Sequence, residues 1–115
     1  MHFIFEIHMK PGYPPEQYAE GWVRASKIIQ TFSGAQGTRL HRKIGEPDVL
    51  LAIATWESKA IRDEMEGRLT DAVRAIIDEQ SPFVDIRFIG EYEAPEWQVI
   101  PEHLQAADPP PGGPA

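Results

Sequence analysis

The sequence contains no cysteine and no long apolar run, and all its lysines and arginines lie within the first 93 residues. Without cysteine the chain has no disulfides, thiolate metal ligands, iron–sulfur clusters or cysteine nucleophiles. No stretch approaches the ~18 apolar residues that a membrane-spanning helix needs. The first residues lack the basic start and apolar core of a signal peptide, so we expect a cytoplasmic protein without a membrane partner.

The charge balance is acidic, with 18 acidic and 11 basic residues and a net charge of −7. This balance argues against non-specific nucleic-acid binding, and we expect no nucleic-acid partner. The 115 residues are 42% hydrophobic and 25% charged, which is typical of one globular domain. Six of the eleven prolines lie at or after Pro95. We therefore expect a domain over residues 1–93 and an extension over 94–115, disordered from about residue 106.

Hydrophobic periodicity predicts the secondary structure. Alternation of apolar and polar residues indicates strands, and apolar residues recurring every three or four positions indicate helices. The expected elements are strands at 2–9, 37–45, 49–56 and 83–92, helices at 14–33, 58–67 and 70–80, and a tight turn at 45–48. The β-α-β-β-α-β order predicts a ferredoxin-like α+β fold, an antiparallel four-stranded sheet with helices on one face.

The third expected strand, residues 49–56, predicts a homodimer. Its odd and even positions are both apolar, as in a strand buried on both faces. Helices cover only one face of such a sheet, and the other would leave an apolar patch that is unusual for a monomer. The same face of a second copy is the economical cover. Residues 97–104 are apolar enough to lie over a sheet edge or to reach the partner.

Two segments carry a family resemblance. Residues 34–37 read Gly-Ala-Gln-Gly before a strand, and residues 51–60 read Leu-Ala-Ile-Ala-Thr-Trp-Glu-Ser-Lys-Ala, a strand that ends in tryptophan before a serine-capped helix. With the element order, residues 1–93 resemble the dimeric α/β-barrel superfamily, in particular the antibiotic-biosynthesis-monooxygenase-like domains. The resemblance implies two sheets packed into a barrel and a pocket between sheet and helices in each subunit. It also implies monooxygenases for aromatic polyketides that use no flavin, metal or haem.

The haem-degrading branch of that superfamily is not expected here. Its members carry an asparagine on the first strand, a tryptophan nine positions after the residue matched by Trp56, and a histidine ten positions further on. The first strand here has no asparagine, and the other two positions hold Met65 and Ala75. Since the resemblance otherwise implies enzymes that use no flavin, metal or haem, we expect no cofactor.

Glu6 and His8 are the candidate catalytic pair, because they share one face of the first strand. A carboxylate beside a histidine raises its basicity and fixes its tautomer, as in a general base. The opposite face of this strand is more apolar and should meet the helices, which places the pair toward the dimer interface. A buried or interfacial polar network, or simple exposure, are the alternatives.

Aromatic and methionine side chains at helical and strand spacings should point into the layer between sheet and helices. They suit a flat aromatic ligand, and they suit an ordinary core equally well. The candidate substrate-binding residues are Tyr18, Trp22, Phe32, Trp56 and Met65, with Tyr13 as a residue that could guard the mouth of the pocket.

Other site chemistry is not supported by the sequence. The four histidines show no close ligand spacing, so we expect no metal site. The basic strand with Arg39, His41, Arg42 and Lys43 could attract an anionic substrate, but charged edge strands are commonly solvated. We expect a cofactor-independent monooxygenase-like protein for a small aromatic or polyketide-like compound. A non-catalytic binding protein and a structural dimeric module are the alternatives.

Overall fold

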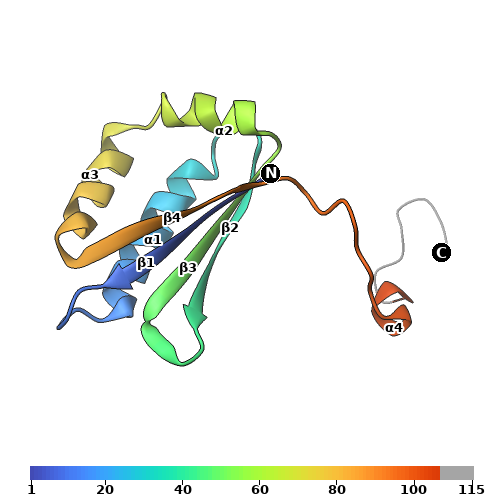
Figure 1. Ribbon diagram of the computed structural model, residues 1–115. Helices are drawn as coiled ribbons and strands as arrows, with labels where there is room; N and C mark the ends of the chain where they lie inside the picture. The colour runs from blue at the N-terminus through green and yellow to red at the C-terminus, as the bar shows by residue number, and fades with distance from the viewer. Residues whose placement is uncertain (107–115) are drawn as a thin grey trace.

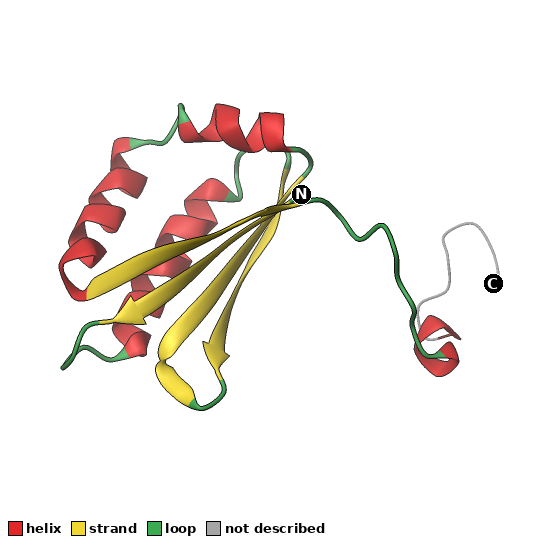
Figure 2. Ribbon diagram, viewed as in Figure 1, coloured by secondary structure: helices red, strands yellow, loops and turns green. Residues whose placement is uncertain are grey.

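The computed structural model describes residues 1–106 of the chain. Figure 2 shows a sheet with helices packed against it and a short helix set apart near the end of the chain. The elements in order are β1 (His2–Met9), α1 (Pro15–Ile29), β2 (Ala35–Lys43), β3 (Glu46–Trp56), α2 (Lys59–Glu66), α3 (Asp71–Gln80), a 3-10 turn (Ser81–Phe83), β4 (Val84–Tyr92) and α4 (Glu102–Ala106).

The sheet is antiparallel throughout, with the strand order β2-β3-β1-β4. Helices α1, α2 and α3 all lie on one face of it, as Figure 1 shows, and the opposite face carries no helix in the described part of the chain. This arrangement confirms the ferredoxin-like α+β fold predicted from the element order. β1 and β3 are the central strands, so each has a neighbouring strand on both sides.

Capping residues explain where the helices begin. The side chain of Ser58 accepts a hydrogen bond from the Ile61 amide, and that of Thr70 accepts one from the Val73 amide, so α2 and α3 each start one residue later. The first helix is shorter than the predicted 14–33, because it ends at Ile29 and its last turn loosens into bonds such as Phe32 N–H to the Ile29 carbonyl. Gly34, with φ of +89°, then turns the chain into β2.

The connection between β2 and β3 differs from the predicted turn at 45–48. Lys43 pairs with Glu46 across the sheet, so the turn consists of Ile44 and Gly45 and β3 already begins at Glu46. Gly45 has φ of +88°, a conformation that glycine adopts without steric cost in a tight turn. The sequence pattern predicts a strand only from residue 49, because Pro47 and Asp48 are poor strand formers. Their backbone nevertheless continues β3 at the end of the hairpin.

The core lies between the sheet and the helices. Ile7 of β1 is fully buried there, together with Leu50 and Ala52 of β3 and Tyr18 of α1. A second buried cluster joins Trp56 at the end of β3 to Met65 of α2. The odd-numbered residues of β1 therefore face the helices, as the alternation of its side chains predicted.

The uncovered face of the sheet, which we call the outer face, carries the alternate residues of each strand. The register places Ile4 of β1 opposite Ile53 of β3, and Glu6 opposite Leu51. β3 is therefore apolar on both faces, while residues 1–106 of one chain cover only one of them. The predicted homodimer remains a prediction at this level.

The end of the chain, which we call the arm (residues 93–106), leaves the body after β4. Figure 1 shows it running away from the sheet and the helices, with α4 near its far end. It does not lie over an edge of its own sheet, one of the two positions expected for residues 97–104. The tail expected to be disordered lies, from residue 107 onward, outside the described residues.

Candidate active-site cavity

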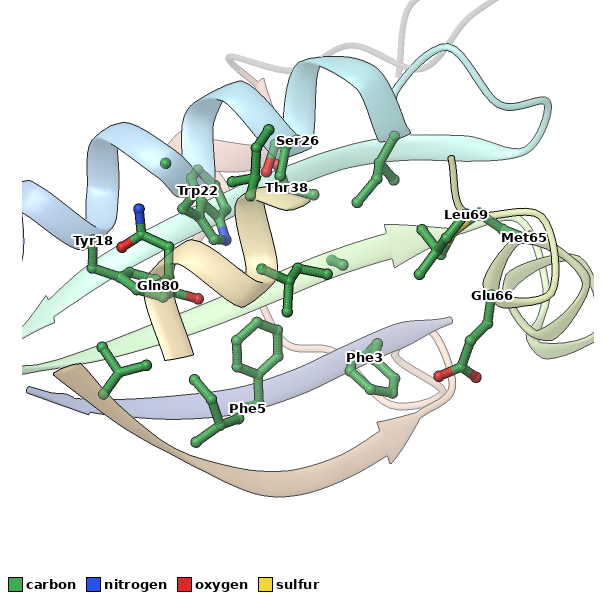
Figure 3. A pocket seen from close by; sticks show the side chains of 18 of the residues that line it. Phe3, Phe5, Tyr18, Trp22, Ser26, Thr38, Met65, Glu66, Leu69 and Gln80 are labelled. Atoms are coloured by element: carbon green, nitrogen blue, oxygen red, sulfur yellow. The ribbon is translucent and has the colours of Figure 1, made fainter. Parts of the chain in front are cut away.

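A cavity of about 390 Å³ lies between the helices and the inner face of the sheet. Binding sites for small organic ligands commonly measure ~300–1,000 Å³ and are mostly apolar, so the size is suitable for one. Figure 3 shows Phe3 and Phe5 on the sheet side, Tyr18, Trp22 and Ser26 on α1, and Met65 and Leu69 at one end.

The lining combines residues from the three packed helices and all four strands of the sheet. It is aromatic or aliphatic over most of its area, with few polar groups. The lining residues are Phe3, Phe5, Tyr18, Gly21, Trp22, Ala25, Ser26, Ile29, Thr38, Ala54, Trp56, Arg62, Met65, Glu66, Leu69, Ile76, Ile77, Gln80, Ser81, Val84, Ile86 and Phe88.

Exposed apolar side chains mark the opening of the cavity. Ile86 and Phe88 of β4 and Ile77 of α3 line it, yet they are 52%, 57% and 50% exposed. β4 is an edge strand, so no further strand of the described chain covers this side. The apolar lining of the cavity is therefore most exposed to solvent along α3 and β4.

Tyr18 places a hydroxyl at one end of the cavity. The residue is 8% exposed, and among the described residues its hydroxyl has no hydrogen-bond partner. Burial raises the pKa of Tyr18 to about 12, because the apolar surroundings disfavour the phenolate. Near neutral pH the group is a neutral donor that can pair with an oxygen of a bound molecule.

Gln80 lies beside Tyr18, as Figure 3 shows. It is 5% exposed, and its Oε1 atom is buried without a partner among the described residues. A β-carbon at Gly21 would lie 2.1 Å from Gln80 Nε2, so glycine allows α1 and α3 to approach this closely. This end of the cavity therefore holds the Tyr18 hydroxyl and a buried Gln80 oxygen without a partner, and burial of such an oxygen is costly unless a ligand pairs with it.

An ion pair stands at the other end. The guanidinium of Arg62 lies 3.9 Å from the centre of the Phe3 ring, and its Nη1 donates to Glu66 Oε2 at 2.9 Å. The Arg62 side chain is only 14% exposed, whereas that of Glu66 is 60% exposed. Arginine over an aromatic face is a stabilising arrangement. Glu66 is the one carboxylate among the described lining residues, and it stands between the cavity and solvent.

The predicted binding residues divide into two groups. Tyr18, Trp22, Trp56 and Met65 line the cavity. Phe32 instead packs against the cluster formed by Trp56 and Met65. Tyr13 stacks on Phe83, with ring centres 5.0 Å apart, and is not among the lining residues. The structure thus brings four of the six residues together at one cavity.

The candidate pair Glu6 and His8 lies on the outer face. His8 Nε2 donates to Glu6 Oε1 at 2.6 Å, and the two side chains are 20% and 25% exposed, His8 first. The register sets Glu6 opposite Arg87 and His8 opposite Asp85 on β4. The sheet separates this network from the cavity, so a catalytic role for the pair stays a prediction that concerns the outer face.

Sequence reasoning missed the polar residues of the cavity. Gln80 continues the helical spacing of the apolar face that includes Ile76 and Ile77, so the 3–4 periodicity contained the signal. Arg62 precedes Met65 by three positions, on the same side of α2. A polar residue at such a position shares the direction of its apolar neighbours and can line the same cavity.

Two other kinds of site are missing from the described part of the chain. Over residues 1–106, no group of three or more histidine, aspartate or glutamate side chains is placed to hold a metal ion. No helix in that range is long and apolar enough to cross a membrane.

Comparison with known proteins gives structural neighbours only. No family model matches the sequence, and no curated protein matches it. SnoaB, a cofactor-independent oxygenase from Streptomyces nogalater, superposes with a TM-score of 0.64 at 12% identity, covering 83% of this chain and 96% of SnoaB. PA3566 from Pseudomonas aeruginosa gives 0.66 at 14% identity, covering 82% and 93%. The crystal structure of an antibiotic biosynthesis monooxygenase gives 0.63 at 12% identity, covering 83% of this chain and 100% of that one.

These likenesses confirm the resemblance drawn from residues 34–37 and 51–60 at the level of fold. The chain has the fold of the antibiotic-biosynthesis-monooxygenase-like proteins. One fold hosts many activities, so function must be argued from the cavity.

Proposed function

We propose that the protein is a cofactor-independent monooxygenase for a small aromatic or polyketide-like compound bound in the cavity. The observation that carries this proposal is the apolar cavity of about 390 Å³, with Trp22 and Trp56 in its wall and a polar group at each end. A flat aromatic molecule buries its faces against such walls, and its oxygen atoms pair with Tyr18 or Arg62. The oxygenase fold of SnoaB adds support by analogy.

The chemistry requires little from the protein. A substrate methylene made acidic by flanking aromatic carbonyl groups loses a proton, and the resulting carbanion transfers an electron to molecular oxygen. The two radicals combine to a peroxide, which loses water. In the balanced reaction one methylene group and one molecule of oxygen give one carbonyl group and one water, with the substrate as the only reductant. The protein supplies a water-poor cavity and a proton acceptor.

Glu66 is our candidate proton acceptor, because it is the one carboxylate among the described residues that line the cavity. Arg62, beside it and over the Phe3 ring, would stabilise negative charge that develops on the substrate. Tyr18, neutral because of its raised pKa, would hold a substrate oxygen at the opposite end.

A second candidate is binding without turnover. The observation that favours it is that Arg62 already holds Glu66 Oε2 at 2.9 Å, while the carboxylate is 60% exposed to water. A hydrated, ion-paired carboxylate is a weak general base. In this case the cavity stores or senses its aromatic ligand.

The two candidates separate in one experiment. The purified protein is titrated with anthrones and quinols while tryptophan fluorescence, melting temperature and oxygen consumption are followed. Binding raises the melting temperature in both cases, because the ligand stabilises only the folded state. Oxygen uptake with stoichiometric quinone or ketone formation supports the oxygenase. Binding with uptake unchanged by the protein leaves only the binding candidate, and no binding contradicts both.

Two pairs of variants connect the outcome to the cavity. Ala54→Phe fills it and should lower ligand affinity at least about tenfold, whereas Ile53→Phe enlarges the next residue on the outer face and should leave affinity unchanged. Glu66→Gln should reduce turnover about a hundredfold with little change in binding. Glu64→Gln on the same helix is its control. Equal turnover in the two glutamine variants would reject Glu66 as the proton acceptor.

We also propose the assembly predicted from the sequence, a homodimer through the outer face, with residues 1–93 as the monooxygenase-like domain, residues 94–115 as an extension, and a cytoplasmic location. The apolar outer-face residues Ile4, Leu51 and Ile53 support the pairing. Sedimentation equilibrium tests it, and a chain that stays monomeric at all concentrations contradicts it.

A further inference from the structure

The arm exposes large apolar side chains. Trp97 is 87% exposed, Val99 is 99% exposed and Leu104 is 51% exposed. Figure 1 shows the arm extending away from the body of its own chain, so its own sheet and helices leave these residues uncovered. Exposed apolar residues gathered in one segment indicate a surface that meets another molecule.

A groove of matching character lies on the outer face of the sheet, near the edge strand β2. Its volume is about 190 Å³, below the ~300 Å³ at which small-molecule sites begin, and suited to a single inserted side chain. We call it the β2–β3 groove. It is lined by Glu6, His41, Arg42, Lys43, Val49, Leu50 and Leu51.

The charges of the arm and the groove are complementary. The arm carries Glu93, Glu96 and Glu102 and no lysine or arginine. None of these glutamates forms an ion pair with the described residues. β2 carries Arg39, His41, Arg42 and Lys43 and no acid.

Part of that basic charge is already used within the chain. Arg42 contacts Glu16 at 2.8 Å, and Lys43 contacts Glu46 at 2.8 Å. Glu6 in the groove is held by His8. Arg39 and His41 form no ion pair with the described residues, and both are exposed. They remain available to carboxylates of an incoming segment.

We propose that the arm of one chain docks on the β2–β3 groove of a second copy, with Trp97 inserted between Val49 and Leu51. Glu96 then lies against Arg39 and His41. Both halves of the contact are on every chain, so a two-fold dimer makes it twice. The arm thereby adds a contact at the β2 edge of the outer face, beside the face-to-face pairing of the sheets, and it does so without any part in ligand binding.

Sedimentation equilibrium tests the energetic part of this proposal. Trp97→Ala should raise the dimer dissociation constant at least about tenfold, because a buried aromatic anchor dominates such contacts. Val23→Ala removes an exposed apolar side chain from α1, outside the arm, the cavity and the groove, and should leave the constant unchanged. An unchanged constant for Trp97→Ala, or a wild-type chain that never dimerises, overturns the proposal.

Photo-cross-linking tests the location. The substitution Trp97→p-benzoylphenylalanine is made, and labelled and unlabelled chains are mixed so that mass spectrometry separates cross-links within a chain from those between chains. Cross-links to residues 39–51 of the other chain are expected. Cross-links to the same chain, or to another surface of the second chain, reject the groove.

Charge reversal tests the recognition. Glu96→Arg and Arg39→Glu should each weaken the dimer several-fold, and the double variant should recover part of the loss, since opposite charges again face each other. If the losses of the two single variants simply add in the double variant, this pairing is excluded. The ligand-induced change in melting temperature should be the same in all arm variants. The dimerisation results can therefore be interpreted even if the proposal for the cavity fails.

Discussion

The two faces of the sheet are built from the same strands and differ in almost every physical property. On β1, Phe3, Phe5 and Ile7 point to the helices, while Ile4 and Glu6 point to the outer face. The inner face encloses a cavity and the domain core. The outer face mixes aliphatic residues with a histidine–carboxylate network. A strand alternates its side chains, so a single register decides which set meets the helices.

This difference shows how one strand can serve two purposes. The inner set provides burial and the shape of a cavity, and a polar residue there must find a partner or a ligand. The outer set tolerates Glu6 and His8, because water or a second chain can satisfy them. A substitution on one face should therefore leave the properties of the other face unchanged, so the two faces can be tested separately.

The largest effect is expected for Ile7→Ala on the inner face. Ile7 is fully buried, so the variant removes several methyl groups and leaves a void. The free energy of unfolding should fall by about 3 kcal/mol. Ile4→Ala on the outer face should cost about 1 kcal/mol at low protein concentration, because Ile4 is only half-buried within one chain. Urea unfolding measures both, and equal losses would contradict the distinction between the faces.

The outer-face variant provides a second comparison. If a second chain covers Ile4, the loss in Ile4→Ala should grow as protein concentration rises, since dimerisation stabilises the folded state by mass action. The loss in Ile7→Ala should not depend on concentration in this way.

The next largest effect is a loss of folding stability at alkaline pH, caused by Tyr18 on the inner side of the sheet. Burial raises the pKa of Tyr18 to about 12 from its ordinary value of 10.0. In the unfolded chain the phenol ionises near the ordinary value, so the stability that depends on its neutral form is complete below about pH 10 and is lost as pH rises toward about 12. The loss should total about 2 to 3 kcal/mol. Tyr18→Phe should remove this part of the pH dependence, and an unchanged profile would reject the assignment.

A smaller effect is expected at Gly34, where the chain enters β2 beneath α2. Its φ of +89° disfavours other residues, and a β-carbon would lie 2.6 Å from Ile61 Cγ2. Gly34→Ala should lower the free energy of unfolding by about 1 to 2 kcal/mol. Gly12→Ala is a useful control, because Gly12 also has positive φ, at +90°, but has nothing within 4 Å. A larger loss of unfolding free energy in Gly34→Ala than in Gly12→Ala would measure the cost of the contact with Ile61, since both variants share the backbone strain.

The smallest effect is expected for the Glu6–His8 contact on the outer face. Both side chains keep some access to water, so the coupling free energy from Glu6→Ala, His8→Ala and the double variant should be about 0.5 to 1 kcal/mol. The same variants test the catalytic hypothesis. Lost activity with an intact dimer supports catalysis by the pair, whereas a weakened dimer with normal turnover supports an interface role.

Much of the fold followed from local patterns. The alternation in β1, the apolar stripe of α1 and the cap Ser58 predicted elements close to those observed. The predicted bounds were wrong at the ends of elements, where strand pairing or contact with solvent determines the last residue. α1 ends at Ile29, earlier than predicted, and β3 begins at Glu46, also earlier than predicted. A terminal residue has few partners in the sequence, so propensity alone is a weak guide to it.

The cavity was only partly accessible to the same reasoning. The direction of Trp22 and Trp56 follows from spacing, and both line the cavity. Phe32 has the same helical spacing but packs against a neighbouring cluster, because α1 has already ended before it. The contact of Gly21 with Gln80 depends on how α1 and α3 approach each other, and no local pattern specifies that distance.

By itself, the sequence determined the period and order of the elements, the absence of cysteine chemistry, the separation of acidic arm from basic strand, and the division of each strand into two faces. These properties depend on neighbours along the chain. Only the tertiary structure decided that Arg62 and Glu66 meet Phe3 at one end of the cavity, and that Tyr18 and Gln80 meet at the other. The reason is physical: a cavity is the space left when separate elements pack, and its polar ends are set by distances between residues far apart in the chain.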